Sequence, residues 1–263
     1  MKNNPLLELQ KQGQSIWYDN IQRGLLVSGK LKKMIDDGEV QGVTSNPSIF
    51  EKAINGSNDY DQAIKEILDN NPNINIKSLY EALVIPDIQN TADLLRNVYE
   101  NTNCKDGYVS IEVSPLLAHD TEKTISEART LFKKVNRPNV MIKVPATKEG
   151  LPAITTLIGE GININVTLMF SRQDYIDVAE AYISGLEKFA LSDGDLSKVA
   201  SVASFFVSRI DTAIDKLITD ASAMRGKIAI ANSKIAYGKF LEIFSRNRFK
   251  ALEEKGAKKQ RLL

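Results

Sequence analysis

Short apolar runs of strand length recur along this sequence, and helical patterns separate them. The runs cover residues 15–21, 41–46, 107–113, 140–145, 164–170 and 202–208. Between them, apolar residues spaced three and four apart predict helices, with clear stripes over 125–135, 175–186 and 210–218. Regular alternation of strand and helix is typical of a parallel sheet that is covered by its connecting helices. We therefore expect an α/β fold.

Local signals support these helix positions. Ser171 and Asp174 form an S-x-x-D capping box, and Pro47 suits the first position of a helix. The long interval 51–106 contains helical segments and predicts a helical insertion between the second and third strands. Because the sequence contains no internal repeat or linker, we expect residues 1–263 to form a single barrel domain.

Polar and apolar side chains alternate along three of the strands. In the run at 162–170, one face carries Asn163, Asn165, Thr167 and Met169, and the other carries Ile162, Ile164, Val166, Leu168 and Phe170. Ser110 and Glu112 alternate with valine and isoleucine in the third strand, as Met141 and Lys143 do in the fourth.

Because the apolar faces receive the helices, the polar faces must line an interior, as in a TIM-type (β/α)₈ barrel with its active site at the strand C-termini. An open nucleotide-binding sheet would bury apolar residues on both faces. The sequence also has neither a G-x-G-x-x-G nor a G-x-x-x-x-G-K-[ST] motif. The pattern therefore favours a barrel.

The segment VMIKVPAT, residues 140–147, places Lys143 inside an apolar strand. A desolvated lysine has a lowered pKa, and its neutral amine can attack a carbonyl carbon to form a Schiff base. The alternative is a lysine whose stem packs while its ammonium group reaches water. The hypothesis is a metal-free enzyme that makes or breaks carbon–carbon bonds.

The barrel interpretation gathers further polar groups around this lysine. They are Glu112, Asn165, Thr167, Asp19 and Asn46. Carboxylates and amides around an amine suit Schiff-base chemistry, because proton transfer and hydroxyl binding are both needed. For Glu112, a plain ion pair with the lysine stays open as an alternative.

Composition excludes several classes of protein. With 34 basic and 33 acidic residues, the net charge is +1, so no global field favours nucleic acid or an anionic membrane. One histidine, His119, and one cysteine, Cys104, provide neither a zinc site nor an intrachain disulfide. The sequence has no apolar stretch long enough for a signal peptide or a spanning helix. We expect a cytoplasmic protein without a zinc site.

Four motifs then identify a family. They are GVTSNPSIF at 42–50, VSIEVSP at 109–115, IKVPAT at 142–147 and NVTLMFS at 165–171. With these motifs in this order, the chain resembles transaldolases over nearly its whole length. The resemblance implies a cofactor-free, cytoplasmic (β/α)₈ barrel of the pentose phosphate pathway. Such enzymes act on sugar phosphates, moving a dihydroxyacetone unit from sedoheptulose 7-phosphate to glyceraldehyde 3-phosphate.

The resemblance also implies catalytic roles. Lys143 corresponds to the Schiff-base nucleophile, and Glu112 with Thr167 corresponds to the pair that positions a proton-shuttling water. Asp19 resembles the group that takes the proton of the C4 hydroxyl as the carbon–carbon bond breaks.

Substrate-binding roles follow in the same way. Asn46, Asn165 and Ser204 match the residues that hold the dihydroxyacetone hydroxyls. Arg209 matches an arginine that binds the sugar phosphate, although an exposed helix arginine without a ligand is the alternative.

The strand count departs from the family pattern. Six strands precede residue 210, and only KQRLL at 259–263 begins a seventh. We therefore expect an incomplete barrel with weak or no turnover, and an open sheet edge that favours self-association. Two other functions stay open: a non-catalytic remnant that binds sugar phosphate or a partner, and an enzyme like fructose-6-phosphate aldolase.

Overall fold

A computed structural model gives the structure of the protein and describes residues 4–219 and 222–263. The chain divides into two compact units. Unit 1 comprises Met1–Glu112 and Thr130–Met141, and unit 2 comprises Val113–Arg129 and Ile142–Leu263. Two elements, α8 (Thr121–Val135) and β4 (Val140–Pro145), have residues in both units.

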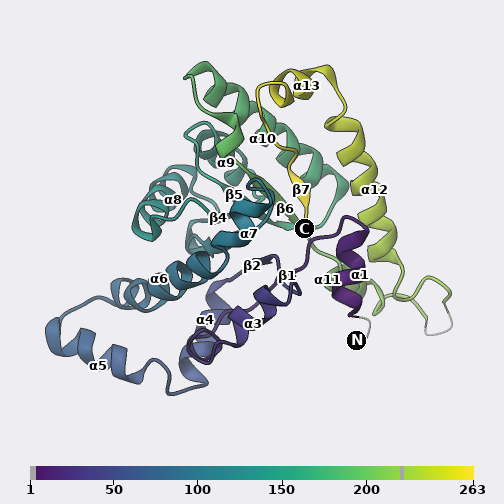
Figure 1. Cartoon of the computed structure of the whole chain (residues 1–263). Coiled ribbons are helices and arrows are strands. Elements are labelled where there is room, and N and C mark those ends of the chain that lie inside the picture. Colours follow the sequence, from purple (N-terminus) through teal and green to yellow (C-terminus); the bar gives the residue numbers. More distant parts are fainter. Residues whose placement is uncertain (1–3, 220–221) are drawn as a thin grey trace. The chain divides into compact units, whose positions relative to one another are not determined.

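Unit 1 contains three complete strands and seven helices among its described residues (Figure 1). These elements are α1 (Pro5–Lys11), β1 (Trp17–Tyr18), α2 (Arg23–Val27), α3 (Lys30–Asp36), β2 (Gly42–Val43), α4 (Pro47–Asn55), α5 (Asp61–Asn70), α6 (Ile76–Leu94), α7 (Arg96–Asn101) and β3 (Val109–Glu112). Helices α5, α6 and α7 occupy the interval in which the sequence predicts inserted helices. The single-domain boundary itself stays a prediction.

The strands of unit 1 are parallel and follow chain order. Trp17 lies beside Gly42, and Val43 lies beside Val109. The chain needs glycine at position 42, because a Cβ atom there would lie 2.5 Å from the indole of Trp17. The N–H of Val109 donates to the carbonyl of Asn139 over 3.1 Å, which brings the start of β4 alongside β3.

Unit 2 contains the remaining strands. Its elements are a 3₁₀ turn (Pro115–Leu117), α9 (Gly150–Ile158), β5 (Ile164–Met169), α10 (Arg172–Leu191), a second 3₁₀ turn (Leu196–Lys198), β6 (Ser201–Phe205), α11 (Ser208–Ile214), α12 (Ile228–Ile243), α13 (Asn247–Glu253) and β7 (Arg261–Leu262). Strands β4, β5, β6 and β7 are parallel neighbours in that order. Parallel strands in chain order, with helices between them, confirm the predicted α/β class of the TIM-barrel type. The seventh strand is also confirmed.

Helices cover the apolar face of the unit 2 sheet. Ile164 and Val166 are fully buried, as are Leu157 of α9 and Leu186 of α10, and both helices pack on β5. Helix α10 begins with the predicted capping box, in which the Ser171 side chain accepts from the Asp174 N–H. The apolar stripes of the sequence therefore formed the helix-covered side of the sheet.

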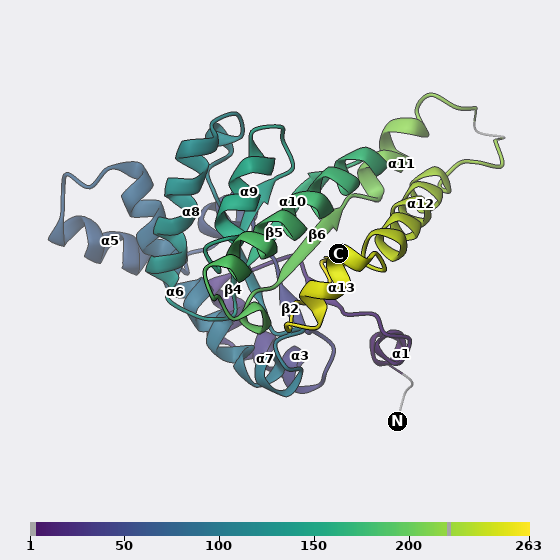
Figure 2. The same cartoon turned by 90° about the horizontal axis from the view of Figure 1, so that it is seen from above.

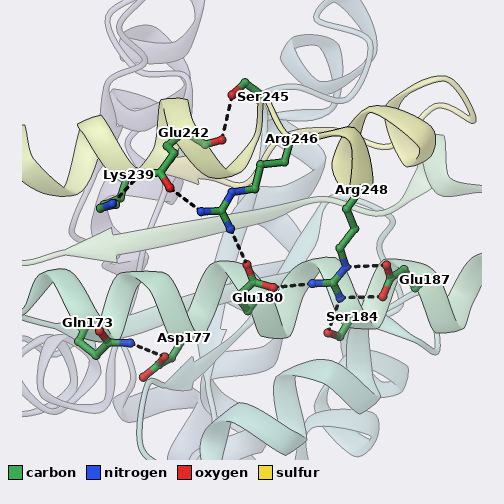
Figure 3. A network of polar contacts seen from close by, with 10 residues as sticks. All are labelled: Gln173, Asp177, Glu180, Ser184, Glu187, Lys239, Glu242, Ser245, Arg246 and Arg248. Atoms are coloured by element: carbon green, nitrogen blue, oxygen red, sulfur yellow. Dashed lines mark hydrogen bonds and ion pairs between the residues drawn. The ribbon is translucent and has the colours of Figure 1, made fainter.

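Helices α12 and α13 run beside α10, as Figure 2 shows from a second direction. An ion-pair network joins them (Figure 3). The guanidinium of Arg248 donates to both carboxylate oxygens of Glu187, each over 2.7 Å, and it also bonds Glu180. No helix in the described part of the chain is both long and apolar enough to cross a membrane.

Several predicted elements are shorter than expected, among them the strand predicted over 41–46, of which only Gly42–Val43 forms. The helix predicted over 210–218 ends at Ile214, because the carbonyl of the next residue, Asp215, accepts from Arg225 and its carboxylate accepts from the N–H of Gly226. The strand predicted over 15–21 contains only Trp17–Tyr18, because the chain leaves the sheet to begin α2.

The face predicted for the end of β5 is wrong. Val166 lies beside Ala203, but Met169 lies beside Phe205, so three steps along β5 match two steps along β6. The extra residue is Leu168, which has a left-handed φ of 64° and is 40% exposed. The extra residue inverts the alternation, so the fully buried Met169 lies on the face of Ile164 and Val166 and not with the polar residues.

Candidate active site

One face of the unit 2 sheet is polar. The β4–β5 register puts Lys143 beside Asn165 and Pro145 beside Thr167. Because side chains alternate along a strand, the lysine, the asparagine and the threonine share a face, and Ser204 of β6 shares it too. Strand pairing has therefore brought together four residues that the sequence selected.

Lys143 is buried, as the sequence predicted, with 7% of its surface exposed. It lies inside β4, and its carbonyl accepts a 3.1 Å hydrogen bond from the N–H of Val113. Its register partner Asn165 is fully buried, and Thr167 is 1% exposed. An amine held away from water among amide and hydroxyl groups has the surroundings that nucleophilic attack on a carbonyl requires.

Unit 1 has a polar face of its own. Asp19 follows β1 directly and is exposed. The hydroxyl of Thr44 donates to its carboxylate oxygen Oδ1. Asn46 ends the segment after β2 and caps α4, because its Oδ1 accepts from the N–H of Ile49 over 2.9 Å. This capping role does not test the predicted contact between Asn46 and substrate.

Glu112 is the last residue of β3 and is half-buried. Its negative charge affects Tyr80 of α6. Burial is the main cause that raises the pKa of Tyr80 to about 12, and the negative charges of Glu112 and Glu81 add to it. The phenol of Tyr80 is therefore protonated at neutral pH.

Sequence reasoning missed Thr44 and Tyr80. Thr44 lies within the GVTSNPSIF motif, two residues before Asn46. Its position on the same strand face was a signal that could have found it. Tyr80 comes from a distant helix, and no spacing in the sequence connects it with Glu112.

Arg209 is the second residue of α11 and is exposed. Its guanidinium carbon lies 4.6 Å from the ring centroid of Phe206. Exposure leaves the guanidinium accessible to an anion, which its planar donors can bind in a bidentate manner.

His119 is 83% exposed at its side chain and pairs with Glu149. Over the described ranges, no group of three or more histidine, cysteine or acidic residues could hold a metal ion. The residues that the sequence selected supply an amine, carboxylates, amides, hydroxyls and a guanidinium.

The sequence from residue 16 to residue 254 matches the family described as Transaldolase/Fructose-6-phosphate aldolase. The chain belongs to this family. The resemblance carried by the four motifs is confirmed. Lys143 and Asn165, on the polar face of unit 2, lie within two of those motifs.

Relatives within the transaldolase group are close over the whole chain. "Transaldolase" of Trichodesmium erythraeum is 50% identical over 276 residues, which span 100% of this chain and 72% of the relative. "Transaldolase 2" of Nostoc punctiforme is 48% identical, with the same coverage. "Transaldolase" of Saccharopolyspora erythraea is 48% identical over 99% of this chain and 71% of its own length.

Proposed function

We propose that this chain is a transaldolase, a transferase that moves a dihydroxyacetone unit from sedoheptulose 7-phosphate to glyceraldehyde 3-phosphate. The observation that carries the proposal is the buried Lys143 on a polar strand face beside Asn165. Membership of the family supports it, and so do relatives named transaldolase whose sequences are about 50% identical to this chain.

The first half of the reaction forms and breaks bonds at the donor. The neutral amine of Lys143 attacks the C2 carbonyl, and loss of water from the carbinolamine gives an iminium ion. Asp19 takes the proton of the C4 hydroxyl, and the C3–C4 bond breaks. The bonding electrons pass into the iminium to give an enamine on the lysine, and erythrose 4-phosphate leaves as the aldehyde.

The second half reverses these steps on a new aldehyde. The enamine attacks glyceraldehyde 3-phosphate, and its alkoxide recovers the proton from Asp19. Water then hydrolyses the iminium and releases fructose 6-phosphate. We assign the positioning of the water to Glu112 and Thr167, since a carboxylate and a hydroxyl can pass protons in both directions.

Binding roles complete the proposal. Asn46, Asn165 and Ser204 hold the hydroxyls of the dihydroxyacetone unit, and Arg209 binds the substrate phosphate. The hydrogen bond between Ser204 and Asn165 and the accessible guanidinium of Arg209 support these assignments.

A transfer assay tests the function. Fructose 6-phosphate and erythrose 4-phosphate are supplied, and sedoheptulose 7-phosphate is measured for the wild type, Lys143→Ala and Lys148→Ala. Lys148 is an exposed lysine just after the same strand, and it serves as the matched control. We expect weak transfer by the wild type and the control, and none by Lys143→Ala, because the Schiff base requires the buried amine.

Omitting erythrose 4-phosphate and measuring free dihydroxyacetone separates the second candidate, a fructose-6-phosphate aldolase, which the family description also includes. A fructose-6-phosphate aldolase would release free dihydroxyacetone without an acceptor, whereas a transaldolase keeps the enamine until an acceptor aldehyde arrives. Folded wild type that binds fructose 6-phosphate and does neither reaction would contradict both functions and favour a non-catalytic remnant.

We also propose that the enzyme works in the cytoplasm, in the non-oxidative pentose phosphate pathway. Association of copies through a sheet edge stays a prediction, and sedimentation velocity over a range of protein concentrations tests it. A single species of monomer mass at all concentrations would contradict association.

A further inference from the structure

The bulge at Leu168 determines which of the side chains after it lies on the polar face of the sheet. With the regular alternation of a strand, Phe170 would share the helix-covered face of Ile164 and Val166. One extra residue inverts that alternation, so Phe170 comes to the face of Asn165. The left-handed backbone of Leu168 is a conformation that leucine rarely adopts, and such outliers gather at functional sites.

Three hydrogen bonds hold the segment after the bulge. The N–H of Phe206 donates to the carbonyl of Met169 over 2.9 Å. The N–H of Phe170 donates to the carboxylate of Asp174 over 3.2 Å, and its carbonyl accepts from Asn232 of α12 over 2.8 Å. The backbone of Phe170 is therefore attached to α10 and α12, and the preceding residue, Met169, is attached to the residue that follows β6.

The ring of Phe170 stacks on Phe206, with centroids 5.2 Å apart and planes 23° apart. Phe206 in turn lies under the guanidinium of Arg209. An aromatic face attracts a guanidinium and restricts its orientation, so the position of the Phe206 ring determines where the guanidinium lies. Phe170 is 38% exposed, and core packing alone does not explain a large apolar side chain at this place.

We propose that Phe170 is a positioning residue, which holds the ring of Phe206 in place and thereby fixes Arg209 for a substrate phosphate. The proposal rests on the proposed function, because it takes Arg209 as the phosphate-binding group. In this proposal, the bulge at Leu168 turns Phe170 toward Phe206.

Acceptor kinetics test this role. The KM for glyceraldehyde 3-phosphate and for unphosphorylated glyceraldehyde is measured at fixed sedoheptulose 7-phosphate, in the wild type, Phe170→Ala and Phe170→Tyr. We expect Phe170→Ala to raise the KM for the phosphorylated acceptor about three- to tenfold, the range of one aromatic pair. The KM for glyceraldehyde and kcat should stay unchanged, and Phe170→Tyr should restore the wild-type KM because it keeps a stacking ring.

Tyr237→Ala is the matched control. Tyr237 stacks on Phe240 with centroids 5.5 Å apart and is 52% exposed, so the variant loses a comparable exposed ring pair. It should change neither KM. An equal rise of KM for both acceptors in Phe170→Ala, or a fall of kcat alone, would overturn the positioning role.

A second measurement does not depend on turnover. The ring of Phe206 should shift the NMR signal of the Arg209 Nε–H proton upfield, and inorganic phosphate should move that signal further. Phe170→Ala should weaken both effects, and an unchanged signal would overturn the proposal. Absence of transfer by the wild type with these NMR effects intact would instead overturn the proposed function.

Discussion

The hydroxyl of Ser204 donates a 2.8 Å hydrogen bond to the side-chain oxygen of Asn165, joining β6 to β5 on the polar face of unit 2. Asn165 is fully buried, and this bond fixes the rotation of its amide group. The amide nitrogen is thereby oriented for the hydroxyl that we assign to it.

We therefore expect Ser204→Ala to lower kcat/KM for transfer by about tenfold, the value of one neutral hydrogen bond. Steady-state kinetics measure it. Ser233→Ala is the control, because the hydroxyl of Ser233 donates to the carbonyl of Ala229 within its own helix. Equal kinetics of the two variants would show that the bond does not support substrate binding.

Unit 1 depends on a buried charge pair. The carboxylate of Asp87 is 2% exposed, accepts from Arg23 over 3.0 Å and accepts from the hydroxyl of Tyr60 over 2.9 Å. Asp87→Asn should lower the free energy of unfolding by about 3 kcal/mol, because it leaves the guanidinium without its buried counter-charge. Urea denaturation measures the loss.

Asp93 provides the comparison for that variant. It lies on the same helix and pairs with Arg137 over 2.6 Å, but its side chain is 50% exposed. Asp93→Asn should cost less than about 1 kcal/mol, because water screens an exposed pair. A similar loss in both variants would contradict the importance of burial.

The network in Figure 3 predicts a dependence of stability on pH. The hydrogen bond from Arg248 lowers the pKa of Glu187 from its usual 4.5 in the folded state. The contribution to stability is therefore complete above pH 4.5 and is lost as the pH falls through the lowered value.

Arg248→Ala should accordingly cost about 1 kcal/mol of unfolding free energy at neutral pH, where its exposed ion pairs are formed. The difference from the wild type should shrink in acid, as the glutamates protonate. Urea denaturation of both proteins, at neutral pH and in acid, measures this difference in unfolding free energy. A difference that is independent of pH would mean that Arg248 stabilises through packing alone.

Local patterns allowed much of the fold to be predicted. The limits of β4 agree with the predicted run at 140–145, and the Ser171 cap starts α10 as expected. These features depend on neighbouring residues, so their signals lie within a few positions of sequence. The bulge at Leu168 could not be predicted, because an extra residue is visible only against the register of the adjacent strand.

The candidate site was predictable to the same extent. Strand alternation placed Lys143, Asn165 and Thr167 on one face, and pairing confirmed it. Strand alternation could not reveal the hydrogen bond between Thr44 and Asp19, or the effect of Glu112 on the pKa of Tyr80, because these interactions join elements that are distant in sequence.

Borohydride trapping tests the central claim most directly. The wild type, Lys143→Ala and Lys148→Ala are each reduced in the presence of fructose 6-phosphate, and intact mass with peptide mapping locates any adduct. We predict one reduced dihydroxyacetone adduct on the peptide that contains Lys143, present in the wild type and Lys148→Ala and absent from Lys143→Ala. Folded wild-type protein without an adduct, or an adduct that persists in Lys143→Ala, would contradict the Schiff-base role of this lysine.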